Sequence, residues 1–158
     1  MTADEARLHI SYSGWASRRL FDAALALPEE EQHREVGVSH KSLLGTLEHI
    51  FWGDRVWFVR TVALGVKPPD EPLTVAWPKL QKGWEDWAAA LTDQDLLRVI
   101  DYKSLNGDEH HTPVWQIVMH VVNHATLHRG QVVSLLRQLG IAPPQTDLIT
   151  YYRVIKAK

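Results

Sequence analysis

The chain of 158 residues contains no cysteine, which excludes disulfides, thiolate metal sites and a cysteine nucleophile. It also has no apolar run of about 18 residues and no signal-like apolar stretch near its start, so neither a membrane span nor a signal peptide is expected. No stretch of Lys and Arg is long enough to neutralise several phosphates, and the net charge is −2, which disfavours nucleic-acid binding. We therefore expect a cytoplasmic protein whose metal ligands, if it has any, are His, Asp or Glu.

The remaining composition is typical of a globular protein, with 45% hydrophobic and 23% charged residues. The length suits one hydrophobic core, so residues 1–158 are expected to form a single helical domain. Seven tryptophans are many for this length, and such rings usually pack in the core or line a pocket.

Apolar residues recur at three- and four-residue steps in four stretches, which predicts four long helices. Their expected ranges are 3–27, 40–64, 78–91 and 113–139, with a proline-rich loop over 66–77 between the second and the third. Ser39 and Thr112 are the expected N-caps of the second and fourth helices, and Pro78 and Pro113 are expected in the first turns of the third and fourth. Long helices joined by connectors of unequal length predict an all-α four-helix bundle.

A small β-hairpin is expected before the last long helix. A β-prone run over 97–102 is followed by the turn-forming pair Asn106-Gly107 and then by a polar run over 108–112. His110 and His111 in the second arm are able to bind a metal, but adjacent histidines in a polar strand are usually solvated.

The last predicted helix carries His120, His124 and His128 at four-residue spacing. Residues four apart lie about 40° apart around a helix and about 6 Å apart along it, so neighbouring imidazoles can chelate one metal ion. The outer two are about 12 Å apart, which is too far for one ion. By spacing alone, the pairs His120/His124 and His124/His128 both stay open, and so does a role as satisfied core histidines.

A third ligand must come from another helix, and His49 is the best placed candidate inside the second one. Gly45 and Gly53 lie one turn before and after it, which either leaves space around the imidazole or lets another helix approach. Three histidines on two helices leave coordination positions open, as in catalytic sites, and imidazole suits zinc, nickel, copper and iron alike.

These residues resemble the DinB/YfiT-like family, a group of bacterial four-helix bundles that bind a divalent metal. The likeness spans nearly the whole chain and rests on three segments. The segments are Tyr12–Leu20, the stretch from Leu47 to Trp57 with His49 and Asp54, and His120–Gln131 with its His-x-x-x-His-Arg-Gly-Gln run.

The resemblance implies that His49, His124 and His128 are the metal ligands, and it implies a homodimer. Zinc or nickel is expected first, with iron, manganese and copper also compatible. More distant relatives are metal-dependent enzymes that use low-molecular-weight thiols, such as mycothiol-dependent maleylpyruvate isomerases and bacillithiol transferases, and some are hydrolases. We therefore expect a thiol S-transferase or hydrolase with open coordination and a small-molecule substrate, for which a low-molecular-weight thiol is one class. The alternative is a non-catalytic stress-response or interaction protein stabilised by its metal.

Supporting roles are suggested for three further side chains. Gln131, three residues after His128, could orient a ligand, and Asp54 or Glu48 could hydrogen-bond an imidazole. Ordinary surface or capping roles are the alternative for each. Arg129 lies about 100° from its neighbour His128 around the helix, which favours a salt bridge or dimer contact over substrate binding.

Overall fold

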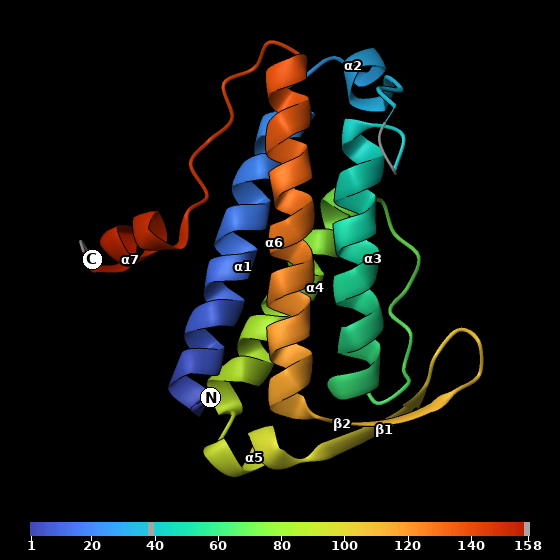
Figure 1. The fold of residues 1–158 in the computed structure, drawn as a ribbon, viewed down its shortest axis with the longest axis vertical. Helices are drawn as coiled ribbons and strands as arrows, with labels where there is room; N and C mark the ends of the chain where they lie inside the picture. The colour runs from blue at the N-terminus through green and yellow to red at the C-terminus, as the bar shows by residue number, and fades with distance from the viewer. Residues whose placement is uncertain (38–39, 157–158) are drawn as a thin grey trace. The chain divides into compact units, whose positions relative to one another are not determined.

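The computed structural model describes residues 1–37 and 40–156. In chain order (Figure 1) its elements are α1 (Ala3–Leu25), α2 (Glu29–His33), α3 (Leu43–Thr61), α4 (Leu73–Ala90), α5 (Asp93–Leu97), β1 (Val99–Lys103), β2 (Glu109–Pro113), α6 (Val114–Gln138) and α7 (Leu148–Lys156). This mostly helical architecture, with an antiparallel hairpin directly before the last long helix, confirms the predicted fold class. Among the described residues, no helix is both long and apolar enough to cross a membrane.

Contacts divide the chain into two compact units. Unit 1 comprises residues 1–11 and 52–123, and unit 2 comprises residues 12–51 and 124–158. The helices α1, α3 and α6 contribute residues to both units.

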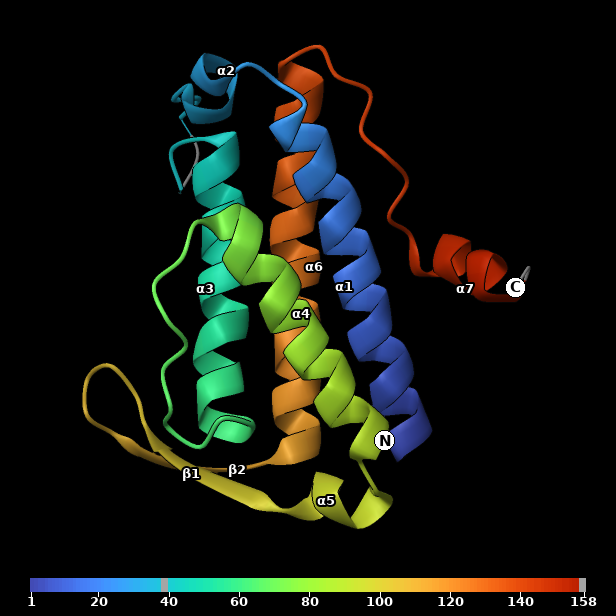
Figure 2. The ribbon, with the colours of Figure 1, turned by 180° about the vertical axis from the view of Figure 1, so that it is seen from behind.

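Unit 1 contains segments of all four long helices. Phe58 of α3 packs edge-on against Trp84 of α4, with the ring centroids 5.4 Å apart. The helix α4 is the one nearest the viewer in Figure 2. Arg7 of α1 donates a hydrogen bond of 2.9 Å to the carbonyl of Leu91, just beyond the end of α4. Buried residues of this unit include Trp77, Leu80, Leu96, Val114, Ile117 and Val118.

The start of α4 differs from the prediction. Pro78, expected in the first turn, lies inside the helix because α4 begins at Leu73. A proline this close to a helix start removes one main-chain hydrogen bond. Burial of Trp77, which is only 2% exposed, offsets that loss, so the proline-rich loop is shorter than expected.

The predicted helix caps also need correction. Thr112 and Pro113 belong to β2, where Thr112 pairs with Ile100 of β1, so strand pairing has taken the place of a helix cap. The helix α3 begins at Leu43 rather than at residue 40, and the Gly45 N–H donates to the Ser42 hydroxyl at 3.1 Å. The predicted cap Ser39 lies outside the described residues.

The helices α2, α5 and α7 have no counterpart in the prediction. The first two are five residues long, and runs of that length carry too little periodicity to be seen. The helix α2 falls in the acidic connector after α1. The helix α5 begins with a capping box, in which the side chains of Thr92 and Asp95 each accept a main-chain N–H of the other residue.

Unit 2 is built from the later part of α1, the first half of α3, the later part of α6, and α7. Tyr151 of α7 packs against Trp15 and Tyr12 of α1, with ring centroids 5.4 and 5.8 Å away. The Tyr12 hydroxyl donates to the Thr146 carbonyl at 2.9 Å, which ties the segment before α7 to α1. Buried residues of this unit include Leu20, Leu43, Leu47, Ile50, Val132, Leu135 and Leu136.

Candidate metal centre

Three predicted histidines meet inside unit 2. The Nε2 atom of His49 on α3 lies 3.1 Å from the Nε2 atom of His124 and 3.1 Å from that of His128, both on α6. The ring centroids of these residues are 4.3 to 4.9 Å apart. His128 is buried, and the other two rings are half-buried. The helical spacing therefore brings both α6 imidazoles to the same point as His49.

The three nitrogen atoms suit a shared cation better than they suit hydrogen bonds. A neutral imidazole nitrogen has either one proton or one lone pair in the ring plane, so His49 Nε2 can make one good hydrogen bond and not two. In a tetrahedral zinc site with metal–nitrogen distances near 2.0–2.1 Å, ligand nitrogens lie about 3.3 Å from one another. The observed 3.1 Å is within a few tenths of an ångström of that separation. The donor set therefore fits a divalent metal ion.

Gln131 fixes the tautomer of His128. The His128 Nδ1 atom lies 2.8 Å from Gln131 Oε1, one turn further along α6. An amide oxygen only accepts hydrogen bonds, so Nδ1 carries the proton and the neutral ring has its lone pair on Nε2. That is the nitrogen directed at His49. Metal-binding histidines are held in this way by an acceptor on their second nitrogen.

A fourth imidazole, which sequence reasoning missed, belongs to the same cluster. His40 precedes α3, and its ring stacks on that of His49 with centroids 3.8 Å apart and planes 16° apart. One ligand nitrogen from each of His40, His49 and His128 can be chosen so that all three lie within 4.8 Å of one another. His40 was missed because it lies in an irregular segment, where no helical spacing relates it to His49. Gly45 was the available signal, since a glycine in a first turn marks a close approach by another group.

The surroundings of His49 and His40 favour the neutral forms of these two imidazoles. Burial lowers the pKa of His49 below its ordinary value, and the nearby His40 and His128 lower it further. Burial also lowers the pKa of His40, with an additional effect of His128. The neutral form is the one that binds metals, so the environment keeps these rings ready to act as ligands.

Arg129 holds α6 in the orientation that aims its neighbour His128 at α3. Its guanidinium, 2% exposed, donates to the hydroxyls of Ser13 at 2.9 Å and Ser17 at 3.2 Å on α1. It also donates to the Thr126 hydroxyl at 2.7 Å, and its Cζ atom lies 5.2 Å from the centroid of the Tyr12 ring. These bonds tie α6 to α1 within unit 2, and the salt bridge or dimer contact expected for Arg129 stays a prediction.

The other sequence candidates lie elsewhere. His120 belongs to unit 1, where its ring faces Trp57 edge-on at 5.2 Å. Asp54 also belongs to unit 1, with a side chain buried there, and Glu48 is exposed on α3. The predicted roles of Asp54 and Glu48 beside an imidazole therefore stay predictions.

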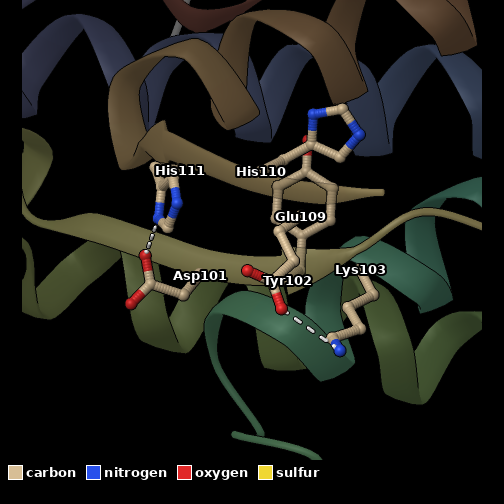
Figure 3. A pocket seen from close by; sticks show the side chains of 6 residues that line it. All are labelled: Asp101, Tyr102, Lys103, Glu109, His110 and His111. Carbon is tan, nitrogen blue, oxygen red and sulfur yellow. Dashed lines mark hydrogen bonds and ion pairs between the residues drawn. The ribbon is translucent and has the colours of Figure 1, made fainter. Parts of the chain in front are cut away.

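The hairpin histidines are engaged in cross-strand pairs (Figure 3). His111 Nδ1 lies 2.7 Å from an Asp101 carboxylate oxygen, and the His110 ring stacks on Tyr102 at 5.3 Å. Both pairs follow the register of β1 and β2, in which these residues are direct partners. Neither histidine belongs to the metal-capable cluster found among the described residues.

Fold and cluster together define a helical protein with a set of histidines that could hold a divalent metal ion. The chain belongs to the DinB family, whose sequence model matches residues 2–156. It is 26% identical over 160 residues to Protein DinB of Bacillus subtilis (strain 168), with 93% of each chain covered. Its fold is similar to that of a DinB-like protein from Bacillus cereus ATCC 10987, with a TM-score of 0.56 and 23% identity. That match covers 82% of this chain and 89% of the other.

Proposed function

We propose that the protein is a divalent-metal-dependent enzyme of the thiol S-transferase or hydrolase type, with His49, His124 and His128 as the metal ligands. The observation that carries this proposal is that the Nε2 atoms of His124 and His128 each lie 3.1 Å from the Nε2 atom of His49. Three protein imidazoles leave at least one coordination position for water or substrate, which distinguishes catalytic from closed sites. Zinc and nickel are the metals proposed first, with iron, manganese and copper also compatible with imidazole ligands.

When bound, a divalent ion would supply Lewis acidity and lower the pKa of water or of a thiol toward neutrality. The chain's own residues provide the geometry for that chemistry. Gln131 keeps the His128 lone pair on Nε2, and Arg129 fixes the rotation of α6 against α1. Because the chain has no cysteine, thiol transfer would take its sulfur from a small-molecule substrate. A homodimer and a cytoplasmic location are part of the same proposal.

The test is a screen of thiol-transfer, ester and amide substrates with metal-loaded protein, compared with His49→Ala treated in the same way. We expect turnover of at least one substrate class by the wild type and none by the variant. Turnover that is the same in both proteins would contradict the proposed site, and so would an absence of turnover across all three classes.

A second candidate is a non-catalytic protein in which the metal only stabilises the fold. His40 favours it, because a fourth imidazole beside the cluster could close the site. The two candidates differ in whether an external ligand reaches the metal. A thiol that binds the metal-loaded protein supports the enzyme, and a metal that excludes every added ligand supports the stabilising role.

A further inference from the structure

The ring of His40 lies against the proposed ligands from a side that neither α3 nor α6 supplies. It covers one face of His49 at 3.8 Å and meets His128 edge-on at 5.2 Å. Its ligand nitrogen lies within 4.8 Å of those of both residues, and a shared ion requires a separation of about 3.3 Å. Stacked rings direct their in-plane lone pairs side by side rather than at one point, so a shared ion requires the half-buried His40 ring to turn out of its stack on His49.

The main chain around His40 is arranged to hold it there. The Ser42 N–H donates to the His40 carbonyl at 2.8 Å, which makes a tight turn centred on Lys41. Lys41 has a φ of +68°, a left-handed conformation that is strained for a residue other than glycine. A side chain at Gly45 would collide with the His40 carbonyl oxygen, so α3 has a glycine where this turn crosses it. Strain that the surroundings maintain often marks a functional position.

We infer that His40 binds the same metal ion as His49, His124 and His128 in the resting protein, so that an incoming ligand must displace it. This inference rests on the proposed metal site and adds a control on access to it. His40 is suited to leave because it lies on an irregular segment, whereas the other three imidazoles are fixed on helices.

The test uses full-length protein loaded with Co²⁺, whose visible absorption is intense in four-coordinate tetrahedral sites and weak when water raises the coordination number. We expect an intense spectrum for the wild type and a weaker, shifted one for His40→Ala, with Co²⁺ bound at least about tenfold more weakly. Added 2-mercaptoethanol, followed by its sulfur-to-cobalt charge-transfer band, should bind His40→Ala at least about tenfold more tightly than the wild type. His40→Gln serves as a second variant that retains a polar side chain of similar reach.

Two glycines provide a matched pair of variants. Gly45→Ala moves the His40 turn without removing its imidazole, so it should behave like His40→Ala. Gly130→Ala, in the same unit, meets no neighbouring atom within 4 Å and should behave like the wild type. His33→Ala, an exposed histidine of α2, controls for loss of an unrelated imidazole.

An unchanged spectrum in His40→Ala and His40→Gln overturns the inference, and so does an unchanged thiol affinity. Failure of the metal site itself gives a different result. In that case the wild type takes up no Co²⁺, or His49→Ala binds it as tightly as the wild type does.

Discussion

Gln131 offers a sensitive test of how the metal ligands are oriented. Its Oε1 atom accepts the Nδ1 proton of His128 at 2.8 Å, which places the His128 lone pair on the nitrogen facing His49. Gln131→Leu keeps similar bulk but removes the acceptor. The imidazole then loses its preferred tautomer and its fixed orientation, both of which metal binding must restore.

The expected magnitude follows from this single contact. Loss of a hydrogen-bond partner to a ligand histidine costs about 10- to 100-fold in metal affinity, which corresponds to about 1.4–2.7 kcal/mol. Gln131→Leu should therefore weaken Zn²⁺ binding by that factor. Gln131→Glu should bind Zn²⁺ as well as the wild type or better, because a carboxylate is a stronger acceptor for the same N–H.

The assay is competition for Zn²⁺ against a chromophoric chelator at fixed pH. Gln138→Leu, an exposed glutamine on the same helix, is the matched control and should leave the affinity unchanged. A Gln131→Leu affinity equal to that of the wild type would refute the orienting role. A Gln131→Glu variant as weak as Gln131→Leu would refute it too, because the acceptor would then not be what matters.

Three further predictions, which use four substitutions, test other parts of the account. In metal titrations, His120→Ala should still bind one metal per chain with at most about a tenfold loss of affinity, whereas His124→Ala should abolish tight binding. The reverse result would show that His124 and His128 are not the pair of ligands on α6. Arg129→Ala should lower the free energy of unfolding in urea by about 2–4 kcal/mol, because it removes bonds of a buried charge to two α1 hydroxyls, and a change below about 0.5 kcal/mol would contradict that role. Gly83→Ala should lower the free energy of unfolding by about 1–3 kcal/mol, because the new Cβ would lie 2.7 Å from Phe58 Cζ. This loss outweighs the better helix propensity of alanine. A higher melting temperature would show that the contact relaxes freely.

The hairpin shows what local sequence can predict. Asn106-Gly107 marked a turn between a β-prone run and a polar run, and Gly107 has a φ of +93°, a conformation that glycine adopts without strain. The position of this turn then sets which residues of β1 and β2 face each other. The start of α4 could not be predicted in the same way, because burial of Trp77 outweighs the local effect of Pro78.

The same distinction between local sequence and tertiary packing applies to the histidine cluster. Helical spacing made His120, His124 and His128 recognisable as candidates, and its place inside the second helix indicated His49. The family resemblance then selected His124 and His128. His40 was missed, because its position depends on a turn at Lys41 and on tertiary contact with α3, for which Gly45 was the available sequence signal. Periodicity carries information about residues on one helix and none about an irregular segment that crosses it.

The central claim, that His49, His124 and His128 bind a divalent metal ion, is tested most directly by the metal content of the protein. The protein is purified without a tag or a nickel column. Its metal content is measured by elemental analysis before and after incubation with Zn²⁺ or Ni²⁺ followed by dialysis. The account predicts about one divalent ion per chain, as purified or after loading. Protein that contains no metal and retains neither added ion would contradict it.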